Sequence, residues 1–318
     1  MNPPVAVAPD AARRTRILIA FGIVYLVWGS TYLGIRIAVE TIPPALCAGL
    51  RFDIAGAVIL AYALWRGDRL PSSRRDWFSI VFTGAMMLIG GNGLVTFSEQ
   101  WVPSNQAALI VATGALWIAW FGTFGARGEK LRPLTLLGLL LGFGGVAVLV
   151  GGSISSRLAP PLAYGALLLA PITWAIGSVY LRRNPVNNAP LMSAAVQMLT
   201  AGIAMTLLGL ATGEAARVQW TPRAVLALAY LTVFGSCIAY AAYVWLVHEV
   251  TPSQLGTYTY VNPAVAVLLG WLVLDEALTR MQVVGTLVIL MAVVMVTWTS
   301  SRRAPSPAAL EKVIEKAA

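Results

Sequence analysis

Charged residues are scarce in this sequence. Only 11% of the 318 residues are charged, while 58% are hydrophobic and the mean hydropathy is +0.76. Ordinary soluble domains carry roughly 25% charged residues, and a water-exposed surface cannot be built from so few. The scarcity excludes a soluble globular domain and predicts that the chain presents most of its surface to lipid.

Cysteine and histidine are also nearly missing. Cys47 and Cys237 both lie inside apolar runs, which excludes a disulfide framework and favours packing roles. His248 is the single histidine, it falls at the end of an apolar run, and no acidic pair lies at membrane depth. An intramembrane enzyme needs a nucleophile with a base, or a set of metal ligands. We therefore expect no enzyme, no metal and no cofactor.

The basic residues that are present describe a topology. A net charge of +9 could indicate nucleic acid, but such a partner needs basic residues clustered on one exposed face, and here they stand in short breaks between apolar runs. With the amino terminus inside, the inner loops and tails hold 16 Lys and Arg against 4 on the other side. This bias predicts that both termini are cytoplasmic and that the partners are lipid and a small solute, not nucleic acid.

Ten apolar runs are long enough to cross a bilayer as helices, which takes about 20 residues each. Prolines stand at or beside the starts of several runs, where a missing backbone N–H costs little. The sequence therefore predicts an all-α membrane protein of ten transmembrane helices. The runs are Ile17 to Ala38, Pro44 to Trp65, Trp77 to Ser98, Ser104 to Gly125, Leu134 to Val150, Leu162 to Leu181, Leu191 to Ala211, Ala224 to Val247, Ser253 to Leu274 and Met281 to Trp298.

The two halves of the chain match at an offset of 146 to 149 residues. Five spans per half is an odd number, so the second copy enters the membrane from the opposite side, as in carriers built from inverted repeats. Chance recurrence of common residues is the alternative, and the shared order argues against it. We predict a first repeat at 17–152 and a second at 160–299, between tails 1–16 and 300–318. The matches are Trp28, Gly29, Ser30 and Arg36 with Trp174, Gly177, Ser178 and Arg182, and Pro103, Ser104, Glu129 and Gly138 with Pro252, Ser253, Glu276 and Gly285.

Polar and aromatic side chains distinguish six spans from the rest. Such groups at membrane depth need protein or water around them, whereas uniformly aliphatic helices suit lipid. We expect the first, third, fourth, sixth, eighth and ninth spans to enclose a central cavity, with the bland fifth and tenth at the periphery. The predicted substrate-binding residues are Tyr25, Trp28, Tyr32, Asn92, Thr96, Thr113, Trp117, Trp174, Ser178, Tyr240, Tyr243, Tyr258, Asn262 and Pro263.

Five charged residues lie in or beside the spans and are candidates for gating or coupling. Arg36 and Arg182 are near span ends and can reach the membrane surface, which favours a place at the rim. Arg51 and Asp53 are deeper, each needs a partner, and at two residues apart they do not face each other. A helix contact and a part in gating both remain open for this pair. Glu99 is the candidate if transport is coupled to protons.

Several segments carry a family resemblance. They are VYLVWGSTYLGIR at 24–36, LRF at 50–52, and VNPAVAVLLGWLVLDE at 261–276 followed by Gly285. In this order the chain resembles the EamA type of the drug/metabolite transporter superfamily over nearly its full length, and within it the YddG type of amino acid exporter. The resemblance implies a ten-helix basket around a central cavity and export of amino acids, related metabolites or drugs across the bacterial inner membrane. Asp53 departs from the pattern, because an apolar residue is more usual there.

An uncharged, ring-lined cavity favours export of neutral or zwitterionic amino acids and related small metabolites by alternating access. We expect facilitated diffusion or weak proton coupling, by a monomer or a weak homodimer. Drug efflux is one alternative. An anionic metabolite is another, for which only Arg51 supplies a cation near the midplane. A channel is not excluded by the residues alone.

Overall fold

The computed structural model describes residues 11–125, 128, 130–151, 159–274 and 280–301. Each predicted apolar run is helical over most of its described residues, which confirms the all-α class. Glu129 and Glu276, which the repeat pairs, lie outside the described residues, as do most of the two tails.

The first half of the chain contains the first five spans, of which the third and fourth consist of consecutive helical pieces. Pro44 and Pro133 each open a helix, as expected for a residue without a backbone N–H. The elements are α1 (Ala11–Val39), α2 (Pro44–Trp65), α3 (Arg74–Gly84), η1 (Ala85–Gly93), α4 (Leu94–Ser98), α5 (Ser104–Ala112), α6 (Gly114–Gly122) and α7 (Pro133–Gly151).

The second half repeats this order. Its eighth and ninth spans are again composed of consecutive pieces, and a short 3₁₀ turn, η2 (Glu214–Arg217), precedes the eighth. The Glu214 carboxylate accepts hydrogen bonds from the backbone N–H groups of Ala45 and Leu46, so this turn satisfies free donors at the start of α2. The elements are α8 (Pro161–Arg183), α9 (Pro190–Ala211), α10 (Pro222–Tyr230), η3 (Leu231–Tyr240), α11 (Ala241–Glu249), α12 (Pro252–Gly256), α13 (Tyr258–Leu274) and α14 (Arg280–Ser301).

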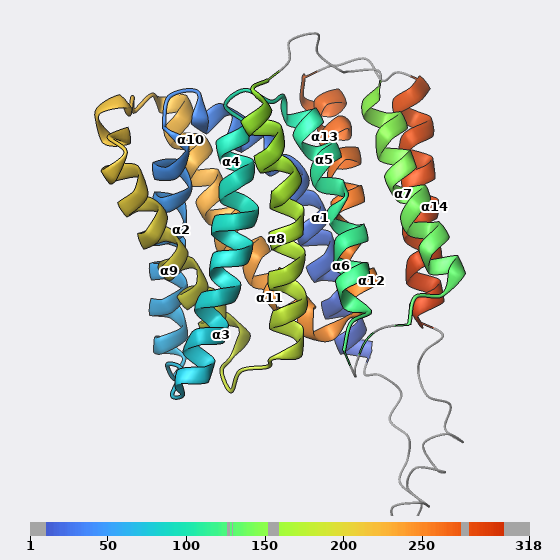
Figure 1. Cartoon of the computed structure of the whole chain (residues 1–318), viewed down its shortest axis with the longest axis horizontal. Helices are drawn as coiled ribbons and strands as arrows, with labels where there is room; N and C mark the ends of the chain where they lie inside the picture. Colours follow the sequence, from blue (N-terminus) through green and yellow to red (C-terminus); the bar gives the residue numbers. More distant parts are fainter. Residues whose placement is uncertain (1–10, 126–127, 129, 152–158, 275–279, 302–318) are drawn as a thin grey trace, which may run out of the picture.

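The helices run side by side between two faces (Figure 1). Among the described residues, six helical stretches are long and apolar enough to cross a membrane by length and composition. The apolar stretches Ala107–Gly122, Pro133–Val148 and Val283–Val296 are shorter. Large exposed apolar side chains, such as Leu140 on α7 and Leu287 on α14, are suited to lipid.

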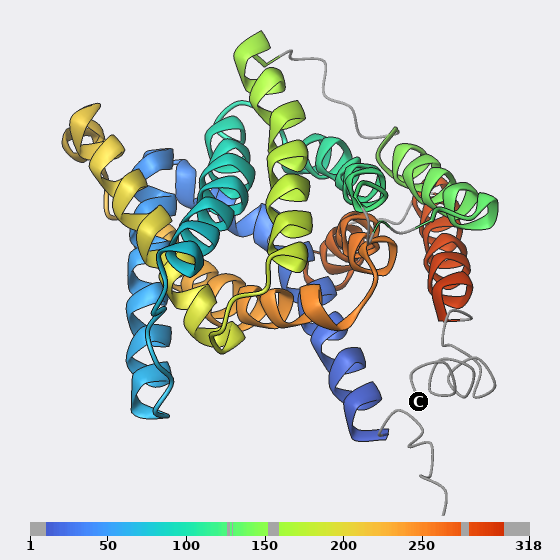
Figure 2. The same cartoon turned by 60° about the horizontal axis from the view of Figure 1, so that its bottom comes forward.

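The two halves form inverted repeats around a central group of helices. In Figure 1 helix α1 ends at the face where α8 begins, so the matching helices run in opposite directions. Helices α2 and α9 pack together at one edge, and α7 and α14 pack together at the opposite edge, in both views (Figure 2). The fifth and tenth spans are therefore peripheral, as predicted.

Each repeat contains a π-helical segment at the same place. The offset of 146 residues that joins Trp28 to Trp174 also joins Ala85 to Leu231, where η1 and η3 begin. A π-helix has wider turns than an α-helix, so it rotates the side chains that follow it, and such segments occur often at functional sites. The sequence analysis assumed α-helical spacing here and did not predict either segment.

Glycines bring the backbones of α2 and α9 into close contact. A Cβ on Gly56 would lie 2.9 Å from the backbone N of Leu199, and a Cβ on Gly202 would lie 2.7 Å from that of Asp53. The Asp53 carboxylate accepts a 2.7 Å hydrogen bond from the Thr206 hydroxyl on α9. Of the two roles left open for Asp53, the structure thus shows the helix contact.

We expect Gly202→Ala to destabilise the protein, because the new Cβ meets backbone atoms of α2 that cannot yield without separating the helices. Overpacking of this kind costs about 1–3 kcal/mol. The midpoint of thermal unfolding in detergent measures the effect. Gly165→Ala on α8 is the matched control, since nothing lies within 4 Å of a Cβ there. Equal midpoints for the two variants would contradict the close-contact interpretation.

Candidate functional site

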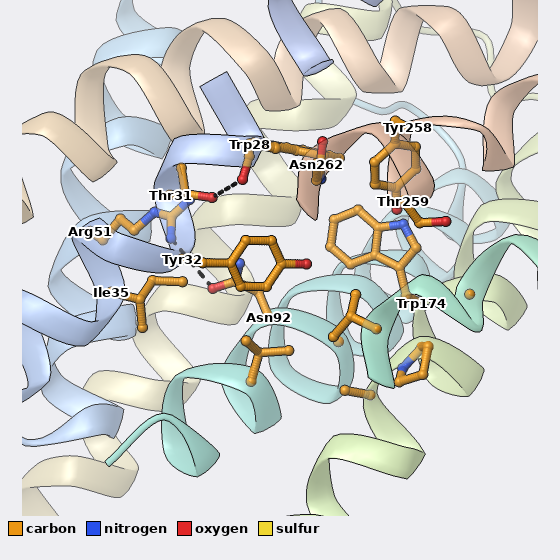
Figure 3. A pocket seen from close by; sticks show the side chains of 16 residues that line it. Trp28, Thr31, Tyr32, Ile35, Arg51, Asn92, Trp174, Tyr258, Thr259 and Asn262 are labelled. Carbon is orange, nitrogen blue, oxygen red and sulfur yellow. Dashed lines mark hydrogen bonds between the residues drawn. The ribbon is translucent and has the colours of Figure 1, made fainter. Parts of the chain in front are cut away.

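A cavity of about 70 Å³ lies between the two repeats. This is room for several water molecules. Its wall comes from α1, α2, η1, α4, α5, α6, α8 and α13, so both halves of the chain contribute (Figure 3). The lining residues are Trp28, Thr31, Tyr32, Ile35, Arg51, Gly91, Asn92, Val95, Val111, Gly114, Ala170, Pro171, Trp174, Tyr258, Thr259 and Asn262.

Four rings, which we call the aromatic quartet, meet at one end of this cavity: Trp28, Trp174, Tyr243 and Tyr258. The Trp28 and Trp174 rings lie edge to face with centroids 5.4 Å apart, although they come from opposite repeats. Tyr243 lies 5.0 Å from the Trp28 ring, and Tyr258 lies 5.2 Å from it. Rings at these separations attract one another beyond their burial, so the quartet is a cohesive barrier.

Hydrogen bonds hold the rings of the quartet in place. Trp28 Nε1–H donates to the Gly235 carbonyl oxygen at 3.1 Å, and Trp174 Nε1–H donates to the Tyr243 hydroxyl at 3.0 Å. The Tyr243 hydroxyl is also 2.7 Å from the Ser178 hydroxyl. Both indole N–H groups therefore have hydrogen-bond acceptors within the protein.

The cavity and the packed core lie on opposite sides of the quartet. From Trp28 the lining continues along α1 to Ile35, toward the face where α1 ends. In the other direction Val24, Val247 and Leu255 pack into the largest apolar core, and Tyr25 bonds to Thr257 across 2.7 Å. The cavity therefore extends from the quartet toward the face where α1 ends, and described apolar side chains pack on the other side.

Six of the fourteen predicted binding residues line this cavity. The structure also explains two neighbours: Ser178 and Tyr243 stand behind Trp174 and orient it. Thr96 bonds back to the Asn92 carbonyl oxygen at 2.9 Å, and Pro263 is buried one residue beyond the lining. The six lining residues are Trp28, Tyr32, Asn92, Trp174, Tyr258 and Asn262.

Three predicted residues face away from the cavity. The Tyr240 hydroxyl donates to Gln197 on α9 at 2.9 Å, and Trp117 packs against Trp120 and Phe121 of its own helix. The Thr113 hydroxyl bonds to a carbonyl one turn earlier, where α5 ends. Of the two residues predicted on the eighth span, Tyr243 belongs to the aromatic quartet, and Tyr240 contacts the Trp174 ring at 6.3 Å without lining the cavity.

Some lining residues were not predicted as binding groups. Thr31 follows Trp28 by three residues and so shares its face of α1, a signal that the sequence contains. Gly91 and Gly114 were not predicted, because the prediction relied on polar and aromatic side chains and glycine has none. Arg51 was predicted as a gating candidate and as the cation for an anionic metabolite, but not as a binding group, because the second span lacks the polar stripe of a cavity helix. Its side chain reaches the wall, so the expectation of an uncharged cavity was wrong.

Arg36 and Arg182 make equivalent contacts at opposite faces. The Arg36 guanidinium donates to the backbone carbonyl of Glu99 at the end of α4, and Arg182 donates to the carbonyls of Val247, at 2.9 Å, and Val250 beyond α11. Both satisfy carbonyls that helix ends leave without partners. The two arginines are therefore rim residues that tie the first span of each repeat to the third.

The Glu99 carboxylate is fully buried near this rim. Its side chain is 0% exposed, and neither oxygen has a hydrogen-bond partner within the described part of the chain. A buried charge without hydrogen bonds is costly, which favours the protonated form of this group. Glu99 does not line the cavity, so any part in coupling would act through the α4 end and Arg36.

Inverted helical repeats around a central cavity are the architecture of a class, the membrane transporters. The model of the EamA-like transporter family matches the chain twice, at residues 15–151 and 161–298. The chain belongs to this family. It is a multi-pass membrane transporter.

Similar proteins cover most of the chain. It is 40% identical to the uncharacterized inner membrane transporter YedA of Escherichia coli K12, over 86% of this chain and 88% of that protein. It is 26% identical to the uncharacterized transporter YvbV of Bacillus subtilis, over 96% and 97% of the two chains. A probable amino-acid metabolite efflux pump of E. coli K12 is 24% identical over 84% and 90%. One solved crystal structure shares the fold with a TM-score of 0.74 at 24% identity, over 90% of this chain and 99% of the other.

Proposed function

We propose that this protein exports neutral or zwitterionic amino acids and related small metabolites across the bacterial inner membrane by alternating access. The observation that carries the proposal is the ring-lined cavity between inverted repeats, closed at one end by the aromatic quartet. The names of two relatives agree with it, one an inner membrane transporter and one a probable amino-acid metabolite efflux pump.

The lining matches the parts of a zwitterion. Trp28 and Trp174 offer apolar ring surface for a side chain. Asn92, Asn262 and Thr259 offer amide and hydroxyl groups, and the Asn262 side-chain oxygen is buried without a hydrogen-bond partner in the described part of the chain. An unpaired acceptor of this kind suits an ammonium group.

The transport cycle follows from the inverted repeats. The excess of Lys and Arg on the amino-terminal side supports cytoplasmic termini, and the cavity then lies on the periplasmic side of the quartet. When each repeat adopts the conformation of the other, the periplasmic side closes and the cytoplasmic side opens. Because the cavity holds only about 70 Å³, a larger solute requires the lining rings to move apart. We propose facilitated diffusion or weak proton coupling, with Glu99 as the coupling group in the second case.

Flux of amino acids tests the proposal directly. Purified protein in proteoliposomes should release preloaded neutral amino acids, among them L-leucine and L-phenylalanine, faster than protein-free liposomes do. The flux should saturate with concentration, because a single binding site holds one solute at a time. Release is compared with a proton gradient present and absent. The proposal is rejected if none of the proteinogenic amino acids moves, and ion conductance without saturable flux would favour a channel.

Replacing Trp28 or Trp174 by alanine should lower this flux by up to about tenfold, because the solute loses a ring contact worth about 0.5–1.5 kcal/mol and about 1.4 kcal/mol is a factor of ten. Both variants should still insert, and their amount in the membrane is measured beside the flux. Trp65→Ala is the matched control, since that indole is 81% exposed at the end of α2. Flux that is unchanged in both tryptophan variants would remove the pair from the binding site.

A further inference from the structure

Arg51 places a buried positive charge in the cavity wall without a counter-ion. The residue is 3% exposed and lines the cavity from α2. The two ion pairs within the described part of the chain join Arg13 to Glu249 and Arg223 to Glu40, and neither involves Arg51. A charge at membrane depth is costly and is retained where it has a partner or a function.

The surroundings of the guanidinium orient it and leave donors unused. Nε–H donates to the Ser236 hydroxyl at 2.7 Å, and Nη1 lies 3.5 Å from the Asn92 side-chain oxygen, at the limit of a hydrogen bond. Nη2 makes no hydrogen bond to any described residue. It lies where a Cβ on Gly235 would come within 2.8 Å, so the glycine makes room for it. In Figure 3 the guanidinium faces Thr31 and Asn92 at the opposite side of the cavity from Trp174.

Neither Asp53 nor Glu99, the two acidic candidates of the spans, is ion-paired with Arg51 among the described residues. Asp53, two residues away on α2, accepts a hydrogen bond from Thr206 at the contact with α9. Glu99 lies beside Arg36, which donates to its backbone carbonyl. No described carboxylate is ion-paired with Arg51, and a molecule in the cavity can supply one.

The internal repeat supplies a comparison. The offset of 146 residues that joins Arg36 to Arg182 also joins Arg51 to Gln197 on α9. Gln197 is fully buried, donates to the Thr83 hydroxyl at 2.7 Å and accepts from Tyr240 at 2.9 Å, and it does not line the cavity. At the equivalent position of the second repeat a neutral amide thus makes the buried polar contacts. Packing alone therefore does not explain why the first repeat has a guanidinium there.

We propose that Arg51 binds the carboxylate of the transported solute through paired N–H donors. This inference rests on the proposed function and narrows its substrates to carboxylic acids, with the α-amino acids as the main class. The carboxylate lies against Arg51 and Asn92, the apolar side chain contacts the rings of Trp28 and Trp174, and the ammonium group meets the free oxygen of Asn262. A guanidinium matches the two oxygens of a carboxylate in a planar, bidentate contact, which gives specificity as well as affinity.

The test measures binding to purified protein by calorimetry, with L-phenylalanine and L-leucine offered as the free acids and as their carboxamides. Arg51→Gln places in the first repeat the residue that the second repeat uses. It should weaken binding of the free acids by about tenfold or more, equivalent to a tenfold rise in Kd. Wild-type protein should bind the carboxamides at least about tenfold more weakly than the acids, and the variant should no longer distinguish them.

Thr83→Val is the matched control, because it removes one buried hydrogen bond to Gln197 outside the cavity. It should change the Kd of the acids less than about twofold. If Arg51→Gln lowers the thermal midpoint below that of Thr83→Val, Arg51→Lys decides instead. Lysine keeps the charge but loses the paired donors. The lysine variant should therefore bind the acids more weakly than wild type does, and the ratio of its Kd values for carboxamide and acid should be smaller.

The inference is overturned if the glutamine variant binds the acids as tightly as the Thr83→Val control does, or if wild-type protein binds acid and carboxamide equally. It is also overturned if the lysine variant matches wild type in its affinity for the acids and in its discrimination against the carboxamides.

A third probe separates this inference from the proposed function. 3-Phenylpropionate has the carboxylate and the ring but no ammonium group. If wild-type protein neither moves nor binds amino acids yet binds this acid in an Arg51-dependent way, the proposed function fails and the carboxylate site stands. If it binds none of these acids, both fail.

Discussion

The structure depends on one constraint: lipid offers no hydrogen bonds, so each polar group at membrane depth must find its partner within the protein or in the cavity. Most of the polar side chains follow this rule visibly. Glu214 caps the start of α2, Arg36 and Arg182 satisfy carbonyls at helix ends, and Asp53 accepts from Thr206 between two helices. The groups that remain without partners are therefore informative. The unused donors of Arg51 and the free side-chain oxygen of Asn262 both belong to residues that line the same cavity.

The inverted repeat arranges these groups, and its departures from symmetry indicate function. Trp28 and Trp174 are equivalent and meet ring to ring, and η1 and η3 occupy equivalent places. Symmetric elements of this kind suit a protein that must exchange two similar conformations. Binding a solute with distinct charged ends needs asymmetry. The pair Arg51 and Gln197 supplies it, with charge in the cavity wall in one repeat and a neutral, fully bonded amide in the other.

Much of the fold could be predicted, because the solvent determines it. Apolar runs of bilayer length, prolines at their starts and the repeat offset predicted the helices and the inverted order, and the bland fifth and tenth spans are indeed peripheral. The cavity wall was predicted only in part. Tyr240 and Trp117 have the right chemistry but do not line the cavity, because Tyr240 bonds to Gln197 on α9 and Trp117 packs against Trp120 of its own helix.

The sequence by itself determined that the chain lies in a membrane as many apolar helices and that its halves are copies of one unit, because composition, run length and the repeat offset are properties of the chain alone. Only the tertiary structure decided which polar groups meet. Asp53 and Arg51 are two residues apart on one helix, yet one packs against α9 and the other reaches the cavity. The difference depends on the neighbouring helices: Gly202 lets α9 come close to Asp53, and Gly235 leaves room for the Arg51 guanidinium. Such close contacts are set by packing between segments far apart in the sequence.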